Sequence, residues 1–338
     1  MSGLAGLLNL GAPRHWTVFV SDFTLPDADV RRLRRETESA ATRVLFAGVD
    51  RLEQQLKNAA IDVANDYVSL HLVSSKFASI SRVRELFMSM PNADMTRVDL
   101  PFAGVRFRRA FATHALDVVL NADYEEQDRF ARRFFHHLEQ HVPYKVVIQT
   151  KDGAELIVAD ESPWFQLAGK MQRGEFRTLP GGEVAYTRDR INGEFTVDGA
   201  LLCSPAQPGA ARTAARLNAL SRHLSERPLR LRICDGKVTE VAGDAELAHT
   251  FRALMRRDER YTAVTEVGIS FNRACATFIH DWPAASNEGR PGVHIAIGGD
   301  PERDDKQKSA RQAPVVHIDF MAATSAVYVN GTPFLKTT

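Results

Sequence analysis

The sequence predicts an α+β protein in which an N-terminal α/β domain, residues 1–145, precedes a mainly β domain with a few helices, residues 146–338. Three observations support this prediction. Segments typical of strands and helices alternate over the first half, and short strands joined by Pro- and Gly-containing loops dominate the second half. The length of 338 residues also favours two domains over one.

The N-terminal half begins with a short apolar strand at 16–20 that ends in a Ser21-Asp22 turn. A long helix is expected from about Pro26, because Pro and acidic residues suit a first helical turn and apolar residues recur at helical spacing as far as Leu56. Further strands are expected at 67–73 and 115–120, and helices at 80–90 and 124–141. This half contains no glycine-rich phosphate-binding motif.

Turn signals divide the second half into short strands. Lys151-Asp152-Gly153 and Asp235-Gly236 each lie between apolar runs, so each predicts a β-hairpin. Strands are expected at 144–150, 154–159, 194–197, 229–234, 237–241, 261–269, 292–297, 315–320 and 326–329, and helices at 211–225 and 245–257. The polar segments 287–292 and 298–311 are expected to be mobile loops.

The charge balance excludes two classes of partner. Lys and Arg total 43 against 42 Asp and Glu, and nucleic-acid or anionic-membrane binding would need a broad basic field. The three cysteines form no Cys-x-x-Cys pair, which favours reduced thiols, and the N-terminus has no apolar stretch long enough to span a bilayer. A soluble, cytoplasmic protein is therefore expected.

Five potential metal ligands lie in or beside strands of the second half: Glu183, Glu266, His294, His317 and Asp319. His317 and Asp319 stand at i and i+2 of one strand and therefore share a face. Glu266 interrupts an apolar strand, where a buried carboxylate is costly unless it is paired or bound to a metal. Two histidines and three carboxylates suit a pair of divalent ions such as Zn²⁺, Mn²⁺ or Co²⁺. Spacing alone does not predict that the five converge.

The order of short motifs resembles that of the aminopeptidase T family. The matching segments are 179–184 (L-P-G-G-E-V), 193–199, 231–238, 265–269, 294–298 and 317–319. This resemblance covers roughly residues 151–330 and implies a dinuclear site built from the five ligands above. It also implies a homodimer, and a reaction in which a metal-bridged water attacks the first peptide bond.

The sequence departs from that family at two positions near the implied site. The family has a tyrosine seven residues after the metal-binding histidine, where it stabilises the tetrahedral intermediate, and Pro301 stands there in this chain. A further glutamate expected shortly before the histidine has a candidate counterpart in Glu288. Loss of one such stabilising donor typically lowers kcat by about 10²–10³. A metal site can therefore persist where hydrolysis does not.

In overall sequence character the chain also resembles peptide-binding proteins of pathways for ribosomally made, modified peptides, the crocagin pathway in particular. That resemblance implies a precursor peptide as ligand and other biosynthetic enzymes as partners. Two hypotheses follow: a peptide binder that does not hydrolyse its ligand, and a metal-dependent aminopeptidase. The retained ligands favour the peptidase. The missing tyrosine and the unfamiliar N-terminal half favour the binder, which the sequence supports better.

Other candidate residues are interpreted as structural. His136, His137 and His141 lie on one predicted helix but lack the glutamate of an H-E-x-x-H motif. Ser204 has no G-x-S-x-G elbow around it, and Cys275 lies among apolar residues as core thiols do. The sequence therefore identifies no catalytic nucleophile.

Overall fold

The computed structural model describes residues 15–25, 27–37, 42–62, 66–74, 77–99, 116–169, 176–179, 181–205, 211–275, 287–298 and 316–337. Helices and strands both contribute substantially, which confirms the predicted α+β class. The chain forms two compact units. Unit 1 consists of Met1–Arg129, Ala168–Gly182 and Asn272–Thr277, and unit 2 consists of Phe130–Leu167, Glu183–Phe271 and Phe278–Thr338.

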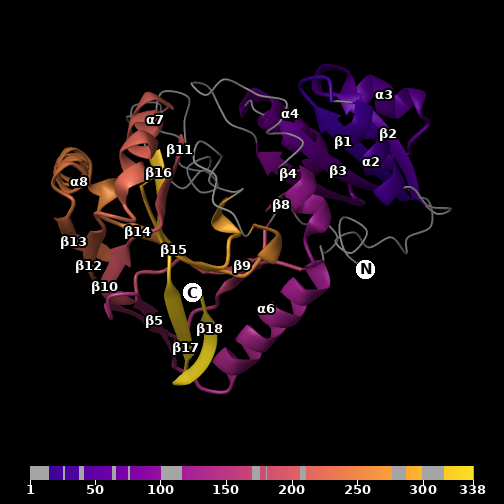
Figure 1. Cartoon of the computed structure of the whole chain (residues 1–338). Coiled ribbons are helices and arrows are strands. Elements are labelled where there is room, and N and C mark those ends of the chain that lie inside the picture. Colours follow the sequence, from indigo (N-terminus) through magenta and orange to yellow (C-terminus); the bar gives the residue numbers. More distant parts are fainter. Residues whose placement is uncertain are drawn as a thin grey trace. The chain divides into compact units, whose positions relative to one another are not determined.

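Unit 1 contains a five-stranded sheet with the strand order β2-β1-β3-β4-β8, in which every neighbouring pair is parallel (Figure 1). Its strands are β1 (His15–Ser21), β2 (Thr42–Gly48), β3 (Tyr67–Ser74), β4 (Ala93–Asp99) and β8 (Phe176–Leu179). Its helices are α2 (Asp27–Thr37), η1 (Val49–Arg51), α3 (Leu52–Asn58), α4 (Phe77–Met88) and η5 (Arg273–Cys275). Parallel neighbours need crossover connections, and α2, α3 and α4 supply them for the first four strands.

One face of the unit 1 sheet is apolar. Successive side chains of a strand point to opposite faces, so Val18 and Val20 of β1 share a face with Leu70 of β3. These side chains form a buried cluster with Leu52 of α3 and Phe87 of α4. Burial of this cluster is the main source of stability for the sheet.

The opposite face of the same sheet carries buried polar side chains. His15 Nε2 lies 2.8 Å from Ser69 Oγ, and His71 Nδ1 lies 2.7 Å from Thr96 Oγ1. Burial lowers the pKa of His15 to about 4, and burial together with the nearby His15 lowers the pKa of His71 to about 3. Both imidazoles are therefore neutral at pH 7.

The long helix expected from Pro26 to Leu56 is wrong. Pro26 lies outside the described residues, α2 ends at Thr37, and Thr42–Gly48 forms strand β2 instead. Val44 lies opposite Thr17 in a parallel ladder along β1. Hydrogen bonds to a strand far away in the sequence therefore override the local helical spacing of the apolar residues.

The strand expected at 115–120 is also wrong, because residues 116–121 are helical and residue 115 lies outside the described residues. Leu116, Val119 and Leu120 are buried at the i, i+3, i+4 spacing of a helix. The Tyr124 hydroxyl donates to the Val119 carbonyl at 3.0 Å. A short apolar run does not distinguish a buried strand from a buried helical turn by periodicity alone.

Unit 2 contains two antiparallel sheets (Figure 1). The seven-stranded sheet has the order β13-β12-β10-β6-β5-β17-β18, with β5 (Tyr144–Thr150), β6 (Glu155–Asp160), β10 (Ile191–Val197), β12 (Leu229–Cys234), β13 (Lys237–Gly243), β17 (Ser325–Val329) and β18 (Thr332–Lys336). The six-stranded sheet has the order β11-β16-β15-β14-β9-β7, with β7 (Phe165–Leu167), β9 (Glu183–Tyr186), β11 (Ala200–Pro205), β14 (Val264–Ser270), β15 (Gly292–Gly298) and β16 (Val316–Ala322). The sheets contact each other through β10 with β16 and β15 with β17.

The helices of unit 2 are α7 (Ala211–Leu220), η3 (Ser221–His223), α8 (Ala245–Arg257) and η4 (Glu259–Tyr261), together with most of α6 (Tyr124–Glu139). The apolar side of α6 packs into the core: the Phe134 ring lies 5.0 Å from that of Trp164, and the Phe130 ring stacks at 3.9 Å on Phe271. These phenylalanines are therefore packing residues.

Both predicted hairpins are confirmed. Strands β5 and β6 pair around Lys151-Asp152-Gly153, and β12 and β13 pair around Asp235-Gly236. Asp235 and Gly236 have φ values of 46° and 68°, the left-handed backbone that a two-residue hairpin turn with positive φ at both positions requires. Asp and Gly tolerate this conformation better than other residues, so the local sequence specifies the turn.

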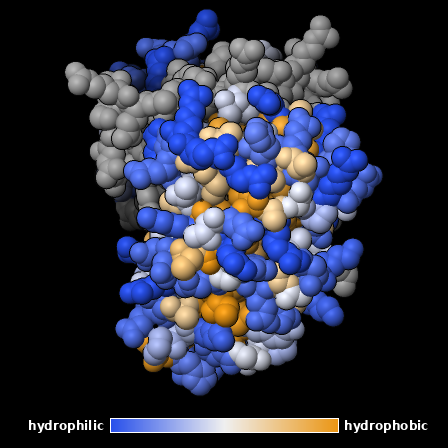
Figure 2. All heavy atoms as spheres, turned by 90° about the vertical axis from the view of Figure 1, so that its left-hand side faces the viewer, coloured by the Kyte–Doolittle hydropathy of each residue, from blue (hydrophilic) through white to orange (hydrophobic). Residues whose placement is uncertain are grey.

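The outer side of β10 and β12 is strongly charged. Arg230 pairs with Asp152, and Arg232 Nη2 lies 3.1 Å from Glu194 Oε1. Figure 2 shows that this side of the molecule is mainly hydrophilic, with hydrophobic atoms in separate small patches. Among the residues that the structure describes, no helix is long and apolar enough to cross a membrane.

Candidate metal centre

The central strands of the six-stranded sheet bring the predicted ligands to one face. His317 and Asp319 alternate with apolar residues along β16 and therefore point to the same side. His294 on β15 lies between β14 and β16, opposite Gly268 on one side and Met321 on the other. Glu183 begins β9 opposite Ser270 of β14. The ladder registers thus place residues from four strands on a common surface.

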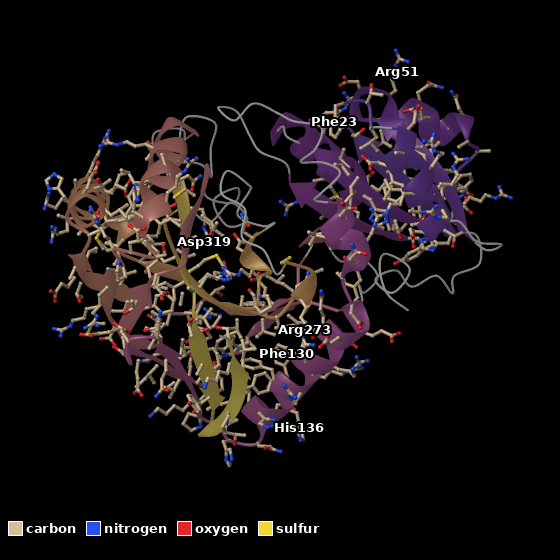
Figure 3. The ribbon with its side chains drawn as sticks, in the orientation of Figure 1. Phe23, Arg51, Phe130, His136, Arg273 and Asp319 are labelled. Atoms are coloured by element: carbon tan, nitrogen blue, oxygen red, sulfur yellow. The ribbon has the colours of Figure 1, made fainter. Side chains whose placement is uncertain are left out.

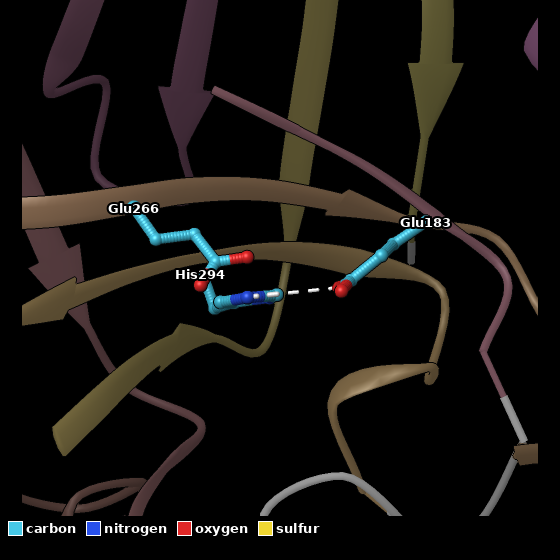
Figure 4. Close-up of side chains that lie close together, drawn as sticks. All are labelled: Glu183, Glu266 and His294. Atoms are coloured by element: carbon cyan, nitrogen blue, oxygen red, sulfur yellow. Dashed lines mark ion pairs between the residues drawn. The ribbon is translucent and has the colours of Figure 1, made fainter. Parts of the chain in front are cut away.

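Glu183, Glu266 and His294 form the first ligand group. One potential ligand atom from each lies within 4.8 Å of the others. His294 Nε2 lies 3.7 Å from Glu183 Oε2, and Figure 4 shows the imidazole between the two glutamates. The Ser270 hydroxyl donates to Glu183 Oε2 at 3.3 Å, which orients this carboxylate.

Glu288, His317 and Asp319 form the second ligand group, with ligand atoms again within 4.8 Å of one another. His317 Nε2 lies 2.9 Å from Asp319 Oδ1, and the side chain of Asp319 is fully buried among the strands (Figure 3). Asn287, next to Glu288, is also buried. The start of the segment 287–292, expected to be a polar loop, is therefore packed inside the protein.

The pKa shifts show that the two groups interact electrostatically. Burial raises the pKa of Glu288 well above its usual value, and the charges of Asp319, Glu183 and Glu266 raise it further. Burial also raises the pKa of Glu183, against the opposing effect of His294. The two groups therefore belong to one buried centre rather than to two independent sites.

Asp319 differs from the two glutamates in the direction of its shift. Burial by itself raises the pKa of Asp319, but the adjacent His317 outweighs this effect, so the net shift is downward. Asp319 is therefore more ready than Glu183 or Glu288 to hold a positive charge at neutral pH.

All five ligands predicted from the sequence thus lie in the two groups, three in the first and two in the second. Glu288 is the residue that reasoning from spacing did not identify. The available signal was the glutamate that the aminopeptidase T resemblance led us to expect before His294. Pro301 and most of the segment 298–311 lie outside the described residues.

The histidines of α6 have other roles. His136 is exposed on the outer side of the helix, with its Nε2 3.0 Å from Gln140 Nε2, and Figure 3 shows it far from Asp319. His137 Nδ1 lies 3.0 Å from the Arg133 carbonyl. Neither ligand group in the described part of the chain includes them. Cys275 is buried, as expected of a core thiol.

Comparisons with known proteins give one family match and one informative fold. The family described as crocagin biosynthetic protein CgnE/B matches residues 55–330. No curated protein matches the chain. The solved structure of 2,5-dihydroxypyridine dioxygenase from Pseudomonas putida KT2440 is 11% identical, with 95% of this chain and 90% of that chain covered and a TM-score of 0.54. At this identity the likeness concerns the fold alone.

Proposed function

The chain belongs to the family of crocagin biosynthetic proteins CgnE/B, and we propose that it binds a ribosomal precursor peptide without hydrolysing it and holds that peptide for partner enzymes. The observation that carries this proposal is the convergence of two imidazoles and three carboxylates of the six-stranded sheet with the carboxylate of Glu288, which precedes β15. Such a centre suits the terminal amine and carbonyl groups of a peptide. The resemblance to aminopeptidase T supports the same class of ligand.

The residues present fit divalent ions. Carboxylate oxygens and imidazole nitrogens are ligands for Zn²⁺, Mn²⁺ and Co²⁺. Four carboxylates gathered together, with Glu183 and Asp319 buried and Glu266 and Glu288 partly buried, are costly without compensating positive charge. Glu183, Glu266 and His294 would hold one ion, and Glu288, His317 and Asp319 would hold the other. Bound ions would polarise a peptide carbonyl and anchor a free amine.

One departure of the sequence from the aminopeptidase T pattern supports binding without cleavage. Pro301 stands where the aminopeptidase T resemblance calls for a tyrosine, and proline has no hydroxyl to donate to a tetrahedral intermediate. An extended peptide would be held by main-chain hydrogen bonds, with side-chain pockets setting its register.

One observation favours the alternative, a metal-dependent aminopeptidase. Glu288 has a strongly raised pKa and lies within the second ligand group. A carboxyl group whose pKa is shifted toward neutrality is suited to general acid–base catalysis. In this alternative, Glu288 would act as general base instead of holding the second ion, and it would take a proton from the attacking water and pass it to the leaving amine.

A binding and stability assay on the precursor peptide separates the two functions. We expect calorimetry to give a Kd of about 1 μM or tighter. Mass spectrometry should find the peptide intact after long incubation with Zn²⁺, Mn²⁺ or Co²⁺. A series of dipeptide amides under the same conditions serves as a test for general aminopeptidase activity. Release of N-terminal residues at enzymatic rates would establish the peptidase in place of the binder.

The proposal extends to assembly and location. We propose a cytoplasmic homodimer, as the aminopeptidase T resemblance implies, with other enzymes of the pathway as partners. All three cysteines are free thiols, which agrees with a reducing compartment. Light scattering coupled to size-exclusion chromatography measures the mass in solution, and a mass of one chain at micromolar concentration would refute the dimer.

A further inference from the structure

A glycine of β14 lies directly against the imidazole of His294. Gly268 and His294 are cross-strand neighbours on β14 and β15. A Cβ atom on Gly268 would lie 2.1 Å from Cε1, 2.3 Å from Nε2 and 2.8 Å from Nδ1 of His294. These distances are far below van der Waals contact. The imidazole therefore occupies the space that any side chain at position 268 would need.

The His294 ring also lacks the hydrogen bond that usually orients a ligating histidine. Such a histidine commonly donates its second ring N–H to a carboxylate or carbonyl. In the part of the chain that the structure describes, His294 Nδ1 is buried and has no hydrogen-bond partner. His294 is only 1% exposed, so the ring is enclosed by its neighbours. The close approach to Gly268 therefore constrains the orientation of the ring.

We infer that Gly268 is the positioning residue of His294, holding the ring against the backbone of β14 so that Nε2 faces Glu183 and Glu266. The functional consequence rests on the proposed metal centre. A methyl group at position 268 would push the ring from 2.1 Å to about 3.5 Å, a displacement on the order of 1 Å. Metal ligands tolerate deviations of only about 0.2 Å, so the displaced nitrogen would no longer bind well.

The neighbouring positions of β14 fit this division of roles. Glu266, Gly268 and Ser270 alternate along one face of the strand. Glu266 supplies a ligand atom, and Ser270 donates to the carboxylate of Glu183. Gly268 lies between them and leaves room for the imidazole of His294. Gly48, by contrast, has no atom within 4 Å of an added Cβ, and it offers a matched control.

The first test is a zinc titration of the full chain by calorimetry at pH 7. Gly268→Ala should weaken the zinc site of Glu183, Glu266 and His294 by about 10–100-fold, the range typical for disturbed support of a ligand, and should weaken the coupled site of Glu288, His317 and Asp319 by less. Gly48→Ala should bind both ions as the wild type does. Unchanged affinity in Gly268→Ala, or equal loss at both sites, would overturn the inference.

The second test needs no metal. Thermal unfolding in EDTA compares Gly268→Ala in the wild-type chain and in a His294→Ala background. The substitution should lower Tm strongly in the first and little in the second, because removing the ring removes the clash. If Gly268→Ala folds only in the His294→Ala background, the inference is also supported. Equal losses in both backgrounds would refute it. If the wild type binds no zinc, the proposed metal centre is refuted. The comparison of Tm with and without His294→Ala then tests the role of Gly268 by itself.

Discussion

Each unit of this protein places two histidines on the polar face of a sheet, but their surroundings differ. In unit 1, His15 and His71 contact the hydroxyls of Ser69 and Thr96, and burial lowers the pKa of both imidazoles. In unit 2, the histidines lie among four carboxylates. A neutral hydroxyl only forms a hydrogen bond with an imidazole, whereas a group of carboxylates is costly unless positive charge compensates it. The partners, and not the histidines, distinguish a packed core from a candidate metal centre.

The largest expected effect is the loss of metal from unit 2 alone. His317→Ala and Asp319→Ala should each lower zinc affinity by at least about 100-fold, because each removes a ligand atom from the second group. His71→Asn in unit 1 should leave zinc binding unchanged. Elemental analysis after dialysis and calorimetry measure both. Full zinc content in the His317 and Asp319 variants would rule this centre out.

The next effect is a pH dependence of stability that originates in unit 1. The pKa values of His15 and His71 fall from 6.5 to about 4 and about 3 on folding, so the unfolded chain binds protons first as the pH falls. The contribution of the two histidines to the free energy of unfolding is complete above pH 6.5 and is lost progressively below it. At pH 5 the two together have lost about 4 kcal/mol.

Urea unfolding between pH 5 and 8 measures this dependence. The double variant His15→Asn/His71→Asn should show a flatter slope of unfolding free energy against pH than the wild type. The carboxylates of unit 2 are present in both proteins, so their effect cancels when the slope of the double variant is subtracted from that of the wild type. Parallel slopes would mean that the two histidines do not take up protons on unfolding.

A smaller effect is expected when one serine of each unit is replaced by alanine. Ser270→Ala removes the donor to Glu183 and should weaken zinc binding by up to about 10-fold. Ser69→Ala removes the partner of His15 and should cost about 1 kcal/mol of stability with zinc affinity unchanged. Calorimetry and urea unfolding on both variants complete the comparison. The reverse pattern would mean that the two polar faces have been assigned the wrong roles.

Sequence reasoning succeeded where the determining interactions are local. The turn at Asp235-Gly236 depends on the backbone preferences of two residues, and the amphipathic pattern of α6 depends on its own side chains. It failed at β2, because that strand is defined by pairing with β1 rather than by its own pattern. A four-residue strand such as β9 gives too little periodicity to recognise.

The candidate site was predictable only in part. The pair His317 and Asp319 follows from strand alternation, and Glu266 is conspicuous in an apolar run. Their convergence with Glu183 depends on the order of strands in the sheet, which no spacing encodes. The expectation that they converge came only from the resemblance to aminopeptidase T. The contact between Gly268 and His294 depends on ladder register and became visible only in three dimensions.

The strand β8 has a consequence for synthesis on the ribosome. It forms the edge of the unit 1 sheet by pairing with β4, although Phe176–Leu179 follows the first strands of unit 2 in the chain. The nascent N-terminal region therefore emerges with β4 as an open edge, which stays unpaired until residue 179 has left the exit tunnel. Open strand edges invite pairing with other chains. An N-terminal fragment ending near residue 145 would carry this edge permanently and should aggregate more readily than the full chain.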